Sequence, residues 1–177
     1  MTTHDSLYVQ LLEDDYDRLD PVVQRFHTLR GHTILHGRCL IDGPTSILGR
    51  CLAWFAGVPS GRTEEEFTFE LLANEHEEQW TRYFPTTTMC SRMHIHDGEL
   101  VERLGPVTFH FHLHAVGDAL EMELASMTVL GVPWPRRLKP DILARETGED
   151  GLFHFEVSAS LPMFGRVTAY KGTLVVP

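Results

Sequence analysis

From Phe67 to the end of the chain, apolar and polar residues alternate at every second position in one short segment after another. This alternation is typical of β-strands with one apolar and one polar face. It predicts strands near 66–73, 77–84, 87–96, 99–104, 107–116, 119–130, 142–146, 152–160 and 166–176. Turn pairs such as Asp-Gly and Gly-Asp separate most of them, so consecutive hairpins should form an antiparallel meander. Because a long twisted meander curls, we expect a curved antiparallel sheet or an incomplete β-barrel.

The first third of the chain is predicted to be partly helical. Ser6 can cap a helix that runs through Leu12, and Asp20-Pro21 is typical of an N-cap before a second helix, which Gly31 would end. Residues 32–42 alternate weakly and predict one more strand. Residues 44–56 carry an apolar stripe at helical spacing, so we expect this helix to pack against the concave face of the sheet. The fold class is therefore α+β, a single domain over 1–177, in the manner of lipocalin-like or lipid-transfer-like containers.

Charge and cysteine content limit the partners. The formal net charge is -10, so phosphate backbones and anionic membrane surfaces should be repelled. No segment has the ~20 apolar residues that would span a bilayer, and the N-terminus does not resemble a signal peptide. The three scattered cysteines fit free thiols in a reducing compartment. We expect a cytoplasmic protein that neither binds nucleic acid nor inserts into a membrane.

Three histidines at alternate positions, His110, His112 and His114, raise the question of a metal site. If Gly-Asp at 117–118 is a two-residue turn, His112 lies opposite Glu123 and His114 opposite Glu121. Cross-strand pairs of this kind are typical of a solvated sheet face. We therefore expect these histidines to face water, and we predict no metal site, although adventitious metal binding by this strand stays open.

A lone carboxylate and a lone guanidinium fall on faces that are otherwise apolar. With a turn at 97–98, Glu102 lies opposite Met93 on the apolar face. Arg82 shares one side of its strand with Trp80 and Phe84. A charged group on an apolar face needs a partner, so we expect Arg82 and Glu102 to meet in the interior. The alternative is that the pair only sets the strand register.

Two further polar residues are candidates for the same interior. Tyr170 aligns with Gly172, where the absence of a side chain leaves room for a close approach, and His27 lies on the second helix. Each also has a structural explanation, Tyr170 as a packed aromatic and His27 as a cation at a helix end. The sequence contains no nucleophile elbow and no glycine-rich phosphate loop.

Several segments together resemble a bacterial family known only as domain of unknown function 4166. They are "SLYVQLLEDDYDRLDPVVQRFHTL", "WTRYF", "LVERLGPVTFHFHL", "LGVPWPRRLKP" and "FHFEVSASLPMFGRVTAYKGTL". The resemblance implies a stand-alone or fused bacterial domain, sometimes encoded next to reductase-type modules, and it implies no activity. The matching positions include His27, Trp80, Arg82, Phe84, Glu102, Arg103, Gly105, Pro106, Pro162, Gly165, Tyr170 and Gly172.

These observations predict a container for an apolar or amphipathic small molecule, with a hydrophobic pocket of roughly 300–1,000 Å³ and no cofactor. The expected ligand-binding residues are Trp80, Phe84, Met93, Ile95, Phe109, Phe111, Leu113, Met122, Phe155, Tyr170 and His27. One alternative is a cofactor-independent isomerase, cyclase or dehydratase, with Glu102 and Arg82 as catalytic residues. Another is a non-catalytic partner module of a reductase-type enzyme, with 129–138 around Trp134 as its contact surface. A homodimer stays open as well.

Overall fold

The computed structural model describes residues 6–47, 50–51, 53, 57, 62–84, 87–163 and 165–177. Within them, α1 (Leu7–Leu12), the 3-10 helix η1 (Glu13–Arg18) and α2 (Pro21–Thr28) precede the strands. The strands are β1 (Gly31–Asp42), β2 (Arg62–Ala73), β3 (Glu77–Tyr83), β4 (Thr88–His96), β5 (Glu99–Leu104), β6 (Val107–Val116), β7 (Ala119–Val129), β8 (Val132–Pro133), β9 (Asp141–Glu149), β10 (Leu152–Leu161) and β11 (Gly165–Leu174). A short 3-10 helix, η2 (Arg136–Leu138), lies between β8 and β9.

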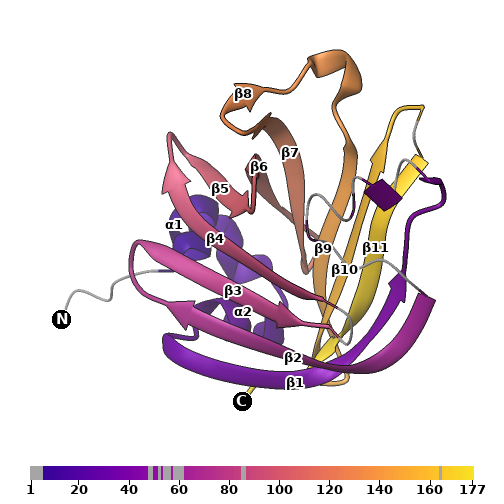
Figure 1. Ribbon diagram of the computed structural model, residues 1–177. Coiled ribbons are helices and arrows are strands. Elements are labelled where there is room, and N and C mark those ends of the chain that lie inside the picture. Colours follow the sequence, from indigo (N-terminus) through magenta and orange to yellow (C-terminus); the bar gives the residue numbers. More distant parts are fainter. Residues whose placement is uncertain are drawn as a thin grey trace.

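The strands form a closed antiparallel barrel (Figure 1). Ten of them follow the order β6-β5-β4-β3-β2-β1-β11-β10-β9-β7, and pairing of β6 with β7 completes the ring. The short β8 adds to the end of β7 as an edge strand, in the proline-rich segment. The antiparallel meander was predicted. The expected incomplete barrel in an α+β fold underestimated both the closure of the sheet and the share of β structure. The sheet closes, and the described chain is mostly β.

Two short helices cover one end of the barrel. The Ser6 hydroxyl accepts a hydrogen bond from the Val9 amide at 3.1 Å, and the Asp20 carboxylate accepts one from the Val22 amide at 2.8 Å. Both predicted caps are therefore confirmed. α1 packs on β4, β5 and β6, while α2 packs on β9 and β10. The residue that caps α2 also contacts the β6–β7 turn, where the Asp20 amide donates a hydrogen bond to the Asp118 carbonyl at 2.8 Å.

Three details of the helical expectations need correction. η1 was not predicted, because its acidic sequence lacks an apolar stripe. α2 ends at Thr28, and Gly31 begins β1 instead of terminating the helix. Of the helix predicted at 44–56, residues 48, 49, 52 and 54–56 fall outside the described residues. No helix in the described ranges is long and apolar enough to cross a membrane.

The hairpin registers agree with those predicted from the turns. His112 pairs with Glu123 and His114 with Glu121 in β6–β7, and Met93 pairs with Glu102 in β4–β5. β9 is longer than expected, because the segment after Glu146 continues to pair with β10. The turn itself takes only two residues, 150 and 151, both with positive φ.

Two glycines allow the paired strands β1 and β11 to lie very close together. A Cβ at Gly172 would lie 2.1 Å from the Arg38 carbonyl oxygen, and one at Gly37 would lie 1.7 Å from the Thr173 carbonyl oxygen. Neither distance is possible for a side chain, so any substitution forces the strands apart. The room predicted at Gly172 is therefore filled by the backbone of the neighbouring strand.

The histidines of β6 line the outside of the barrel. His110 Nδ1 lies 3.0 Å from a Glu99 carboxylate oxygen, and His112 Nε2 lies 3.5 Å from the other. His114 contacts Glu123 at 3.2 Å, diagonally across from its register partner. Among the described residues, no group of three or more histidine, cysteine or acidic side chains is placed to hold a metal ion.

Candidate functional site

The barrel encloses two adjoining hollows. The deep hollow has a volume of about 110 Å³, and the outer hollow about 140 Å³. They share the lining residues Leu104, Phe109, Ile142, Ala159 and Thr168. Each is smaller than the pocket expected from the sequence. Because the outer hollow is bounded by Val107, Val129 and Pro140 at the strand ends away from the helices, it forms the mouth.

Arg82 reaches the deep hollow from β3 across an aromatic surface. Its guanidinium lies 5.0 Å from the centre of the Trp80 ring and 5.9 Å from that of Phe69. Its Nη1 donates a hydrogen bond to the Ser91 hydroxyl at 3.1 Å. Arg82 is 8% exposed, so stacking and this one hydrogen bond hold the cation with little help from bulk water.

Glu102 faces Arg82 from β5 but lies beyond hydrogen-bond distance. The gap between its Oε1 and Arg82 Nη2 is 3.9 Å, and its side chain is 17% exposed. The predicted meeting of these two charges therefore occurs, as a loose ion pair on the wall of the hollow. A carboxylate held this way is available to another polar group.

Tyr170 adds a phenol to the same wall from β11. Burial raises the pKa of its hydroxyl to about 12, although the nearby Arg82 acts in the opposite direction. At neutral pH this group is therefore a neutral hydroxyl that can donate or accept a hydrogen bond.

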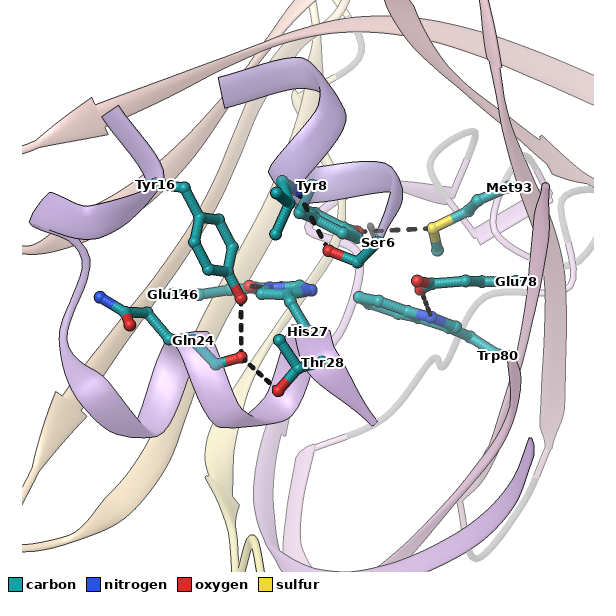
Figure 2. Close-up of polar contacts among 11 residues, drawn as sticks. Ser6, Tyr8, Tyr16, Gln24, His27, Thr28, Glu78, Trp80, Met93 and Glu146 are labelled. Atoms are coloured by element: carbon teal, nitrogen blue, oxygen red, sulfur yellow. Dashed lines mark hydrogen bonds and ion pairs between the residues drawn. The ribbon is translucent and has the colours of Figure 1, made fainter. Parts of the chain in front are cut away.

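A second polar cluster lies between α2 and the barrel, and Figure 2 shows how its members converge. His27 Nε2 is 2.5 Å from Glu146 Oε2, and the side chains are 0% and 8% exposed. The Tyr8 ring lies on the imidazole with centroids 3.6 Å apart. His27 Nδ1 has no partner among the described residues. Because the Glu146 carboxylate can only accept, His27 Nε2 is the donor of this hydrogen bond.

Glu78 is a further buried acid in this cluster. Its carboxylate accepts a hydrogen bond from Trp80 Nε1 at 3.0 Å. Burial raises the pKa of the Glu78 carboxyl, while His27 and the Trp80 hydrogen bond lower it less strongly. Burial also raises the pKa of Tyr8 well above its usual value, and its hydroxyl contacts the Met93 sulfur at 3.6 Å.

The structure brings eight of the sequence-predicted site residues to the deep hollow: Trp80, Arg82, Met93, Glu102, Phe109, Phe111, Met122 and Tyr170. It does not bring Phe84, Ile95, Leu113, Phe155 or His27 there. Phe84 instead packs against Phe67 and Tyr170, with ring centroids 5.3 and 5.5 Å apart. His27 lies one hydrogen bond away, through Glu146.

Glu146 and Glu78 were missed by the sequence reasoning. Glu146 continues the apolar alternation of Ile142 and Ala144, so it is a lone carboxylate on an apolar face, as Glu102 is. It was overlooked because the Glu-Thr-Gly segment was taken for a turn. Glu78 has the same parity as Trp80 and Arg82, and that parity alone could have identified it.

Larger hollows lie on the outer wall, of about 570 and 450 Å³. The larger of the two is lined by charges of both signs, among them Arg38, Glu64 and Lys171. Arg38 and Glu64 contact each other at 3.5 Å with side chains 70% and 63% exposed. Because water reaches most of both side chains, this ion pair offers a charged ligand little beyond what solvent offers.

Comparisons with known proteins support a family assignment. The family model described as "Domain of unknown function (DUF4166)" matches residues 19–174. The crystal structure of Rv2717c from M. tuberculosis is similar over 90% of this chain and 99% of that chain, with 13% identity and a TM-score of 0.47. Similarity at this level implies nothing about a shared ligand. The chain has no significant match among curated proteins.

Proposed function

We propose that this chain, which belongs to the DUF4166 family, is a container that binds a small apolar or amphipathic molecule inside its barrel. The observation that carries the proposal is the pair of adjoining hollows, apolar at the mouth and bearing Arg82 and Glu102 at depth. A mostly apolar cavity with a few convergent polar groups is the usual composition of a ligand site.

In this proposal the ligand enters through the outer hollow and its polar end is anchored in the deep hollow. α1 and α2 cover one end of the barrel, and the outer hollow opens at the other, between β5–β6 and the segment after β7. Trp134 borders this mouth and is half-buried, with its indole nitrogen donating to the Leu138 carbonyl at 2.7 Å. This hydrogen bond supports a role as part of the mouth more than as an exposed partner-binding residue.

The proposal is tested by filling the hollow. Ala159 lines both hollows, so Ala159→Trp should occupy the space a ligand needs. Its neighbour Ser158 lines a groove on the outer wall, so Ser158→Trp is the matched control. The neutral dye N-phenyl-1-naphthylamine should fluoresce with the unmodified protein and with Ser158→Trp, and lose most of this signal with Ala159→Trp. Equal binding by all three proteins would contradict a site inside the barrel.

A second candidate function rests on Glu102. A loosely paired carboxylate beside an apolar hollow is suited to move a proton on a bound substrate without a cofactor, with Arg82 stabilising the charge that develops. Glu102→Gln keeps the shape and removes the proton-transferring group. Unchanged turnover of a substrate found to react in the barrel would exclude this role.

A further inference from the structure

The polar groups of the deep hollow differ in how much hydrogen bonding remains available. Arg82 already donates to Ser91 and covers the Trp80 ring. Among the residues the structure describes, none donates a hydrogen bond to the Glu102 carboxylate, which is partly open to the hollow. The Glu102 carboxylate is therefore a hydrogen-bond acceptor with capacity for a further donor at the end of the cavity.

The charge balance of the hollow also favours one kind of ligand. Two carboxylates line it, Glu102 and Glu146, and Arg82 is the cation that faces them. Arg145 also borders the hollow, but its guanidinium donates to Glu121 at 2.9 Å and its side chain is 43% exposed. Bringing a third carboxylate into this space adds repulsion that water cannot screen well.

We infer that the barrel selects ligands whose polar end is neutral or cationic and donates a hydrogen bond, an alcohol, amide or amine, and that it discriminates against carboxylates. This inference rests on the proposed function. The polar end donates to Glu102, and a neutral hydroxyl or amide can also accept from Arg82. The apolar part extends toward the mouth, where Val107, Met127 and Val129 line the outer hollow.

The test compares three ligands with the same ten-carbon chain on the unmodified protein. 1-Decanol, decylamine and decanoate compete with N-phenyl-1-naphthylamine at pH 7.5, all below their aggregation limits. We expect decanol and decylamine each to displace half of the dye at a concentration at least about tenfold lower than decanoate needs. Repulsion between the decanoate carboxylate and the carboxylates of a poorly solvated cavity is large enough to cause a difference of this size. Decanoate binding as tightly as decanol would overturn the inference.

A charge-removing variant gives an independent readout. Glu102→Gln should improve decanoate binding several-fold and weaken decylamine binding, because the carboxylate that opposes one and pairs with the other is gone. Glu123→Gln, on the exposed outer face, is the matched control and should change neither. No change in ligand preference with Glu102→Gln would overturn the assignment of selectivity to this residue.

The two proposals fail in different ways. If the dye does not bind inside the barrel, the container function fails and the selectivity falls with it. If the dye binds there and none of the three ligands displaces it, only the ligand class is wrong. If all three displace it and decanoate is the best, the container function stands and the ligand class is wrong. The ligand comparison needs no variant, so it decides the inference even if Glu102→Gln does not fold.

Discussion

The buried pair between His27 and Glu146 should have a far larger coupling energy than the exposed pair of His114 and Glu123 on the outer wall. It joins α2 to β9 across 119 residues of sequence, with side chains 0% and 8% exposed. Glu146→Leu leaves the imidazole with no hydrogen bond at either nitrogen, since Nδ1 already lacks a partner among the described residues. Breaking a buried pair by removing one partner costs about 3–5 kcal/mol, and we expect each single variant to lose this much.

Removing both partners should cost much less than the sum. The double variant His27→Leu, Glu146→Leu removes both members of the pair together. The rest of the site consists of rings such as Tyr8 and Phe26 and of the Glu78 carboxylate, which keeps its hydrogen bond from Trp80. We therefore expect a coupling energy of at least about 2 kcal/mol in a double-mutant cycle. Urea unfolding at pH 7.5, followed by tryptophan fluorescence, gives the four unfolding free energies.

The outer wall supplies a matched control with the same residue types. His114 and Glu123 lie 3.2 Å apart with side chains 49% and 68% exposed. The same cycle on this pair should give a coupling energy of about 1 kcal/mol or less, because water solvates both groups whether or not they are paired. Additive effects at the buried pair, within about 0.5 kcal/mol, would refute the reasoning.

Three further predictions concern other parts of the barrel. Burial raises the native pKa of Glu78 above its usual 4.5, so the stability this group contributes is complete below that pH and is lost as the pH rises through the native pKa. The melting temperature of Glu78→Gln should therefore rise relative to that of the unmodified protein as the pH rises from 4.5 to 8. A constant difference between the two melting temperatures would contradict this. Gly172→Ala should lower the free energy of unfolding by about 1–3 kcal/mol or prevent folding, because the added Cβ would meet the Arg38 carbonyl oxygen. An unchanged urea midpoint would contradict this. Burial raises the pKa of the Cys39 thiol to about 11. At pH 8 a disulfide reagent should therefore modify the two exposed cysteines quickly and Cys39 only after unfolding. Rapid modification of all three thiols would show that Cys39 is accessible in the folded protein.

Local pattern was enough to predict the hairpins and one contact of the site. A turn sequence and strict alternation together determine which residues face each other, so Met93 opposite Glu102 follows from the sequence alone. The meeting of Arg82 with Glu102 follows from the same parity argument, because both belong to apolar faces that turn inward.

Long-range geometry could not be predicted in this way. His27 and Glu146 are brought together by the docking of α2 on β9, for which neither segment carries a local signal. Closure depends on β1–β11 and β7–β9, pairs of strands that are not hairpins. The size of the hollows depends on how side chains from opposite walls interdigitate, and this is a property of the finished barrel.

The joint between β7 and β9 differs from the others around the barrel. It pairs only Leu120 with Glu146 and Glu121 with Arg145, both near the end covered by the helices. Beyond these pairs, Met122 and Ile142 border the deep hollow without a shared ladder between their strands. Backbone amides along this stretch should exchange with deuterium sooner than those of β10, which pairs along nearly its whole length on both sides. We therefore expect the wall of the barrel to open first along this line, while the longer ladders elsewhere in the ring stay paired.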